Sequence, residues 1–287
     1  MLVSIYVPTK NRVALLKEAV ASVQRQSYAN WELVIVNDGS TDETAEYLAA
    51  VSAQDSRIRY INMPASVGGC RARNAAIQAA RGDMVTGLDD DDTFGPGRLQ
   101  AFVSAWQALA GEKKPVSCLY SQISEVQHGR VVGVTSKPAS CDLEDMFTAN
   151  VVGSQIFAPR QFYLDAGLFN PEMPAWQDME FYMRLLKRFG TARLVDEGNY
   201  FFENTPRVDR VSTKSQQNIR RAFELVNALH AEGLGRRTQR LYLQLFVRVY
   251  DIQPSLADVL AFVRLGWWPE GWVRLLKAFV RNRLPRR

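Results

Sequence analysis

The alternation of short apolar runs with amphipathic stretches in residues 1–90 constrains the fold of this chain more than any other feature. The apolar runs, rich in β-branched residues, lie at residues 2–7, 31–37, 57–62 and 83–88. The stretches between them place apolar residues at helical spacing. The first covers residues 13–26, the second ends at about residue 53, and the third covers residues 71–80. Strands that alternate with helices in this way predict a parallel sheet with crossover helices. The predicted fold class is therefore α/β.

Polar clusters follow three of the predicted strands, at residues 8–12, 37–40 and 89–92. The carboxyl ends of parallel strands meet at one edge of a sheet, and ligands bind at that edge. We therefore expect the three clusters to form one site. Ser40 or Thr41 is expected to cap the helix that follows the second cluster.

After residue 92 the pattern is less regular. Helical spacing returns at residues 98–109 and 181–189, and strand-like runs lie at residues 116–126, 130–135 and 151–158. From about residue 211 onward only helical patterns occur. We therefore expect two parts: an α/β domain of residues 1–210 with a mixed, mainly parallel sheet, and a basic helical extension of residues 211–287.

Four consecutive aspartates, Asp89 to Asp92, directly follow the fourth apolar run. Adjacent carboxylates repel one another, and a cation relieves that repulsion. Carboxylate oxygens suit Mg²⁺ or Mn²⁺, ions that also bind diphosphates. The D-x-D spacing lets two of these carboxylates reach one ion, directly or through water. The alternative is a solvated acidic turn.

Five further residues have both a functional and a structural interpretation. Asp38 could accept a hydrogen bond from a nucleobase, or it could cap a helix. Arg71 and Arg73 could contact phosphate or base, or they could form a solvated helix face. Asp178 could be a general base or a helix N-cap. Trp176 beside it could present an apolar face to a sugar ring or pack in the core.

Several functional classes are excluded by patterns that the sequence lacks. The three cysteines have no CxxC spacing, so neither a disulfide framework nor a zinc site is predicted. His128 and His230 are the only histidines and are expected to be structural or exposed, which leaves no Ser-His-Asp set. Neither GxGxxG after the first strand nor GxxxxGK[ST] is present. No apolar run reaches the roughly 18 residues that span a bilayer, and the first residues resemble a strand rather than a signal peptide, so a cytoplasmic protein is expected.

Charge is distributed unevenly along the chain. Residues 1–205 hold 24 acidic and 19 basic side chains, whereas residues 206–287 hold 6 acidic and 16 basic ones. One helical stripe in the basic part is formed by Trp272, Leu275, Leu276, Phe279 and Val280. A basic amphipathic helix with tryptophans is typical of a membrane interface, so residues 267–287 are predicted to contact an anionic membrane surface. The alternative is packing on the α/β domain or on a second copy in a homodimer.

Taken in order, the motifs of this chain resemble those of the family 2 inverting glycosyltransferases, which have a GT-A fold. The matching segments are residues 7–12, 36–42, 67–74, 82–92, 166–170 and 177–180, together with Arg184. The resemblance covers residues 1 to about 215. It implies a GT-A catalytic domain at residues 1–210 and transfer of a sugar from a nucleotide-sugar donor.

The resemblance also implies a role for each matching residue. Binding of the donor is assigned to Pro8, Thr9, Asn11, Arg12, Asp38, Arg73, Asp89 and Asp90. Asp91, the second aspartate of the D-x-D motif, would hold Mn²⁺ or Mg²⁺. Asp178 would be the catalytic base. Independently of the resemblance, Trp176 and Glu180 beside it are predicted to contact the acceptor.

Three segments depart from family patterns. Gln177 stands where the family usually has Glu before the base, which removes one charge near Asp178. Many members have an Arg-x-His-x-x-Ser segment whose His completes the metal shell, whereas residues 207–212 place Asp209 there as a candidate metal ligand. The Gln-x-x-Arg-Trp motif of processive synthases is absent, so transfer of a single sugar is expected.

The resemblance and the basic tail together predict an inverting, metal-dependent glycosyltransferase at the inner face of the cell membrane. The expected donor is a UDP-sugar, and the expected acceptor is a hydroxyl of a glycan or lipid-linked glycan in envelope polysaccharide biosynthesis. A nucleotidyltransferase is one alternative, but it would need glycines that residues 10–12 lack. A nucleic-acid-binding protein that uses the tail is another, and the acidic edge of the site argues against it.

Overall fold

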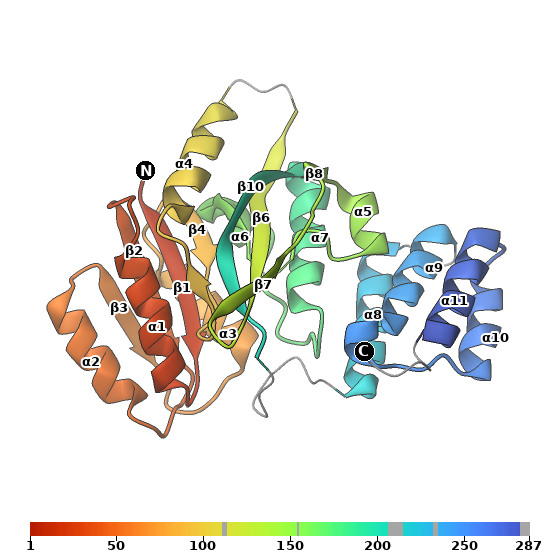
Figure 1. Cartoon of the computed structure of the whole chain (residues 1–287), viewed down its shortest axis with the longest axis horizontal. Helices are drawn as coiled ribbons and strands as arrows, with labels where there is room; N and C mark the ends of the chain where they lie inside the picture. The colour runs from red at the N-terminus through yellow and green to blue at the C-terminus, as the bar shows by residue number, and fades with distance from the viewer. Residues whose placement is uncertain (111–113, 154, 206–214, 232–234, 282–287) are drawn as a thin grey trace.

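The computed structural model describes residues 1–110, 114–153, 155–205, 215–231 and 235–281. In these residues ten strands form one sheet in the order β3-β2-β1-β4-β9-β6-β10-β5, with β7 beside β6 and β8 beside β10 (Figure 1). The strands are β1 (Val3–Thr9), β2 (Trp31–Asn37), β3 (Ile58–Asn62), β4 (Met84–Gly87), β5 (Thr93–Phe94), β6 (Val116–Gln127), β7 (Arg130–Val134), β8 (Ser140–Cys141), β9 (Phe157–Pro159) and β10 (Thr191–Glu203). The predicted α/β class with a mixed sheet is confirmed.

Four parallel strands build the first half of the sheet. β1 pairs with β2 and with β4, and β2 pairs with β3. The crossovers between them are α1 (Val13–Gln24), α2 (Thr44–Gln54) and α3 (Gly69–Ala79). All seven residues of β2 are buried, as expected for a strand that helices cover on both faces. The predicted elements are all present here, with ends shifted by no more than two residues.

The second half of the sheet differs from the prediction at β9 and at β5, β8 and β10, three strands without predicted counterparts. The strand expected over residues 151–158 begins only at Phe157, because Val152 and Ile156 before it are buried in a loop. In that loop Gln155 accepts a hydrogen bond from the Tyr6 hydroxyl at 3.2 Å. β10 has no predicted counterpart, since polar residues 196–199 interrupt its apolar pattern. It nevertheless lies inside the sheet, between β6 and β5.

Helices cover both faces of the sheet. One buried cluster joins alternate residues of β1, such as Ile5, to α1 and α4 (Arg98–Ala108). The other cluster joins Tyr6, whose side chain faces the opposite way, to α3, α6 (Arg160–Asp165) and α7 (Gln177–Phe189). This second cluster continues into the C-terminal helices, so the helical extension and the α/β part share one hydrophobic core.

The helical extension lies beside α5 (Leu143–Thr148) and α7 at one end of the molecule (Figure 1). It consists of α8 (Gln216–Val226), a π-helical turn (Asn227–Ala231), α9 (Arg236–Leu243), two 3-10 turns (Gln244–Phe246 and Arg248–Tyr250), α10 (Leu256–Arg264) and α11 (Pro269–Arg281). The Gln244 side chain donates to the carbonyls of Met146 and Phe147 in α5, both at 2.9 Å. The expected boundary at residue 210 falls outside the described residues, so the division into two domains stays a prediction.

The side chains of the apolar stripe predicted for the tail do not all face the same way: some pack inside the extension and others face solvent. Leu275 is buried, and Trp272 packs edge-on against Phe262 of α10, with ring centroids 5.2 Å apart. Leu276 and Val280 instead face solvent, at 63% and 53% exposure. Helix α11 therefore uses one apolar face inside the extension and leaves another uncovered. No helix among the described residues has both the length and the apolarity to cross a bilayer.

Candidate active site

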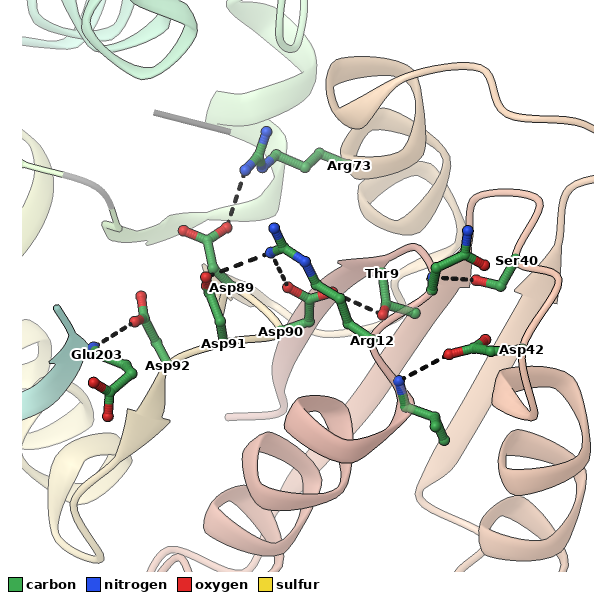
Figure 2. Close-up of polar contacts among 12 residues, drawn as sticks. Thr9, Arg12, Ser40, Asp42, Arg73, Asp89, Asp90, Asp91, Asp92 and Glu203 are labelled. Carbon is green, nitrogen blue, oxygen red and sulfur yellow. Dashed lines mark hydrogen bonds and ion pairs between the residues drawn. The ribbon is translucent and has the colours of Figure 1, made fainter. Parts of the chain in front are cut away.

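The first contact of the site joins β1 to the loop after β4. Tyr6 lies opposite Gly87 in parallel register, so Thr9 and Asp90, each three residues further on, meet at the sheet edge. The Thr9 hydroxyl donates to Asp90 Oδ2 at 2.8 Å (Figure 2). Pro8 precedes this contact as a half-buried residue of β1. The register of the sheet thereby brings together the first and third polar clusters.

Arg12 holds two of the four consecutive aspartates (Figure 2). Its Nη1 lies 3.2 Å from Asp90 Oδ1 and 3.4 Å from Asp91 Oδ2. Burial raises the pKa of the Asp90 carboxyl to about 6, although Thr9 and Arg12 both act to lower it. Asp91 and Asp89 keep more exposure, at 18% and 26% of their side chains. These two carboxylates are therefore the more accessible to a ligand.

Arg73 of α3 connects the aspartates to the candidate base. Its Nη2 lies 3.0 Å from Asp89 Oδ1 (Figure 2). Burial acts to lower the pKa of the Arg73 guanidinium, but the charges of Asp89 and Asp178 outweigh burial and raise it. Asp178 and Asp89, far apart in the sequence, thus act on one cation. The Arg73 Nε is buried without a partner among the described residues, which leaves a donor unused in the site.

Asp92 points away from the other three aspartates (Figure 2). It accepts a hydrogen bond from the Tyr200 hydroxyl at 2.6 Å and another from the Glu203 N–H at 3.0 Å. Burial raises the pKa of the Asp92 carboxyl, and the nearby charges of Asp89 and Asp91 add to the rise. Because both partners belong to β10, Asp92 anchors the acidic loop to the strand that the sequence pattern did not reveal.

Asp38 already has three hydrogen-bond partners within the protein. Its buried carboxylate accepts from the Val67 N–H at 2.6 Å, the Gly68 N–H at 3.1 Å and the Ser66 hydroxyl at 2.8 Å. The alternative as a helix cap is wrong, because α2 begins only at Thr44, whereas the assignment to a nucleobase stays a prediction. Asp38 therefore holds segment 66–68 beside the sheet edge, through partners that no local pattern could identify.

Asn11 ties the loop after β1 to the loop after β2. Its N–H donates to Ser40 Oγ at 2.9 Å (Figure 2), and its Oδ1 accepts from the Thr41 N–H at 2.7 Å. Neither Ser40 nor Thr41 caps α2, since Asp42 accepts from the first N–H of that helix at 3.2 Å. Asp42 also accepts from the Val13 N–H at the start of α1, at 3.2 Å. One carboxylate thus serves two helix starts, a role that the sequence analysis missed.

Helix α7 begins at Gln177, so Asp178 lies in its first turn and is not the N-cap. The cap is Trp176, whose φ of 57° and ψ of 26° are left-handed. Such a conformation costs a non-glycine residue about 1–3 kcal/mol. The Trp176 indole N–H donates to the Tyr250 hydroxyl oxygen at 2.8 Å. Trp176 is therefore bonded to the helical extension.

The prediction that Glu180 contacts an acceptor is wrong. Its side chain is 1% exposed, and Arg184 Nε and Nη2 donate to its two oxygens, each at 2.8 Å. His230 Nε2 of the extension lies 3.3 Å from Glu180 Oε1. Burial acts to raise the pKa of Glu180, but His230 and Arg184 outweigh it and hold the pKa below its usual value. Glu180 is an internal link between α7 and the extension.

Arg71 from the sequence analysis does not join the cluster. Arg71 is 55% exposed at its side chain and lies 3.7 Å from Glu172. Asp209 lies outside the described residues, so its assignment as a metal ligand stays a prediction. Among the residues that the structure describes, no group of three or more His, Cys, Asp or Glu side chains could hold a metal by itself.

Comparison with known proteins defines the class to which this fold and site belong. The model of the family described as "Glycosyl transferase family 2" matches residues 4–111. WcaA of Escherichia coli strain K12, provisionally named a colanic acid biosynthesis glycosyl transferase, is 36% identical over 206 residues, which are 68% of this chain and 70% of WcaA. The chain belongs to the family 2 glycosyltransferases. This membership sets aside the nucleotidyltransferase and nucleic-acid-binding alternatives.

Further relatives share shorter segments or the fold alone. The Escherichia coli UDP-Glc:alpha-D-GlcNAc-diphosphoundecaprenol beta-1,3-glucosyltransferase WfgD is 31% identical over 132 residues, 46% of this chain and 49% of WfgD. The chain likewise spans less than half the length of several other curated relatives. The crystal structure of S. aureus TarS 1-349 in complex with UDP-GlcNAc superposes with a TM-score of 0.67 at 19% identity, covering 98% of this chain and 81% of that one. It supports the GT-A-type fold.

Proposed function

We propose that this glycosyltransferase moves a single sugar, with inversion, from a UDP-sugar to a hydroxyl of a glycan or lipid-linked glycan acceptor. The observation that carries the proposal is the half-buried Arg73, which pairs with Asp89 at 3.0 Å and whose pKa the charge of Asp178 also raises. Asp89 belongs to the acidic motif expected to meet the donor, and Asp178 is the candidate base. A donor diphosphate beside Arg73 would then lie within reach of a deprotonated acceptor hydroxyl.

Donor binding is assigned to the edge formed by the three polar clusters. Arg12 and Arg73 supply positive charge for the diphosphate, and a guanidinium can donate to two phosphate oxygens at once. Asp38 accepts three hydrogen bonds, whereas a carboxylate has about four acceptor positions, so one position remains for a nucleobase N–H. WfgD is named for its UDP-Glc donor, and TarS forms a complex with UDP-GlcNAc; both relatives support this donor class.

A divalent cation fits the accessible pair of carboxylates. Asp89 and Asp91 offer hard oxygen ligands with partial exposure, and donor phosphates would complete the coordination that two carboxylates leave open. When bound, Mn²⁺ or Mg²⁺ would neutralise charge on the leaving diphosphate. The mannosyltransferase PcManGT from Pyrobaculum calidifontis, in its complex with GDP-Man and Mn²⁺, supports the choice of metal (TM-score 0.57, 17% identity, 98% of this chain and 86% of that one).

Asp178 is assigned the proton transfer. Its carboxylate accepts the proton of the acceptor hydroxyl as that oxygen attacks the anomeric carbon. The new carbon–oxygen bond forms on the face of the anomeric carbon opposite the bond to the diphosphate. That bond breaks, and UDP leaves. Arg12 and Arg73 stabilise the charge of the departing diphosphate. A single displacement of this kind inverts the anomeric configuration.

The acceptor is proposed to be presented at an anionic membrane surface. We define the outer ridge as the exposed apolar side chains of α10, α11 and the turn between them: Leu256, Leu260, Val263, Trp267, Val273, Leu276 and Val280. Exposed basic residues of the same two helices, Arg264, Arg274 and Lys277, complement anionic headgroups. The enzyme would then act in envelope polysaccharide biosynthesis at the inner face of the membrane. The names of WcaA and WfgD support that process.

A donor screen tests the proposal directly. Thermal stabilisation and slow donor hydrolysis would be measured with UDP, UDP-glucose and UDP-GlcNAc, each with and without Mn²⁺. We expect Mn²⁺-dependent stabilisation that weakens at least about tenfold in Asp91→Asn. Asp83→Asn is the matched control, since Asp83 is exposed and its carboxylate, at the other end of β4, accepts from the Leu2 N–H. No response to any of the three nucleotides would contradict the proposal.

A further inference from the structure

We infer that the helical extension positions the catalytic base, with Tyr250 as the positioning residue that holds the start of α7. The inference rests on the proposed role of Asp178 as base. It concerns the first turn of α7, residues 177–180, in which Asp178 is flanked by two residues bonded to the extension. The extension would thereby contribute to the active site by positioning Asp178, in addition to its proposed contact with a membrane.

The first link lies two residues before the base. The Trp176 indole N–H donates to the Tyr250 hydroxyl oxygen at 2.8 Å, and the two rings are tilted with centroids 6.4 Å apart. Trp176 is also the residue whose backbone is left-handed, at φ 57°. A non-glycine residue keeps that conformation only when its surroundings hold it. The bond to Tyr250 is a directional contact that can do so.

The second link lies two residues after the base. His230 Nε2, from the π-helical turn of the extension, is 3.3 Å from Glu180 Oε1, and both side chains are almost fully buried, at 2% and 1% exposure. Arg184 fastens the other side of Glu180 and donates to the Leu168 carbonyl at 2.6 Å. The first turn of α7 is therefore held from the extension on one side and from the loop after α6 on the other.

The backbone connects the two links through one hydrogen bond. The Glu180 N–H donates to the Trp176 carbonyl at 2.9 Å, which is the first intrahelical bond of α7. A change in the backbone of Trp176 would therefore reorient this turn and the Asp178 carboxylate within it. Misplacement of a reacting group by about 1 Å can cost roughly 100-fold in rate. Loss of the Tyr250 hydroxyl should consequently slow the chemistry without altering donor binding.

The test compares Tyr250→Phe with Tyr242→Phe. Tyr242 is a second extension tyrosine with a buried hydroxyl, which donates to Asp258 at 2.7 Å, and its ring packs against Phe223, Phe246 and Phe262 of the extension. Amide hydrogen exchange and UDP-sugar hydrolysis, with the UDP-sugar selected in the donor screen, would be measured on the full chain. In Tyr250→Phe we expect amide exchange at residues 180–182 to become about tenfold faster. We expect hydrolysis of the UDP-sugar to become about tenfold slower, while the affinity for UDP stays unchanged.

The possible outcomes separate the inference from the proposed function. Equal effects of Tyr250→Phe and Tyr242→Phe at residues 180–182 would mean general loosening of the extension and would overturn the inference. So would normal exchange and hydrolysis in Tyr250→Phe when Asp178→Asn is inactive. If Asp178→Asn hydrolyses the donor at the normal rate, the proposed base is wrong, and the exchange data still report whether Tyr250 holds this turn.

Discussion

The parallel half of the sheet and the helical extension use their side chains in opposite ways. In the parallel half, carboxylates gather at one edge and are matched by Arg12 and Arg73. In the extension, basic residues predominate, and apolar side chains face outward. Ten of the thirteen large apolar side chains that are exposed in the described residues belong to residues 215–281. The other three, Val131, Val132 and Val134, lie on β7.

This difference indicates that the two regions have separate roles and that helix α7 is common to both. The acidic edge is the proposed site of the donor and the cation, and the outer ridge is the proposed contact with a lipid surface. Helix α7 contacts both regions, because the charge of Asp178 in its first turn acts on Arg73, and Trp176 and Glu180 are bonded to the extension. Substitutions in one region, with the other region as reference, test this difference.

Asp178→Asn should have the largest effect and should be confined to the chemistry. An amide cannot accept the acceptor proton, so turnover should fall by about 10²–10⁴-fold. Affinity for UDP and the melting temperature should stay close to those of the unaltered protein. Glu172→Gln is the control, since Glu172 is an exposed carboxylate in the loop before α7. Substantial residual turnover in Asp178→Asn would remove the base from the mechanism.

Asp258→Asn should destabilise the extension rather than the site. Burial acts to raise the pKa of Asp258, but hydrogen bonds from Arg220, Ser255 and Tyr242 outweigh it and lower the pKa from 3.8 to about 2. A carboxyl with a lowered pKa in the folded state adds stability that is complete above its unfolded pKa and lost as the pH falls through about 2. Chemical denaturation at pH 7 should show a loss of about 2 kcal/mol.

The pH dependence of that loss checks its origin. The difference between Asp258→Asn and the unaltered chain should shrink as the pH is lowered from about 4 to about 2. Asp55→Asn in the α/β part is the reference, because its partner Arg57 is 41% exposed, and an exposed pair contributes less than about 1 kcal/mol. A loss in Asp258→Asn that does not change with pH would mean that packing, and not the charge of Asp258, stabilises the extension.

Charge placed on the outer ridge should have the smallest effect, and only on membrane binding. Leu260→Glu and Leu276→Glu alter side chains that are 60% and 63% exposed, so the fold should tolerate them. Each should weaken binding to anionic phosphatidylglycerol vesicles about tenfold, as expected when one leucine no longer enters the interface. Val132→Glu on β7, at 56% exposure, is the control and should bind normally. Equal binding by all three variants would contradict the ridge as a docking surface.

The sequence predicted the secondary structure of the parallel half of the sheet more completely than that of the later strands and the helical extension. In residues 1–90 every predicted strand and helix is present, because periodic apolar residues and strand-end turns are local patterns. β10 was missed, since its middle residues 196–199 are polar and its place in the sheet depends on pairing with distant β6. The tail was predicted as one apolar stripe, but packing inside the extension buried Leu275 and left Leu276 outside.

The sequence by itself determined the class of fold, the edge at which the polar clusters meet and the membership of the family. Those properties follow from spacing within short segments, which the chain order preserves. Only the tertiary structure decided which charged groups remain available. Asp38 bonds to segment 66–68, Asp92 to β10, and Glu180 to His230. Such pairings depend on burial, because a carboxylate removed from water must find donors wherever the fold places them.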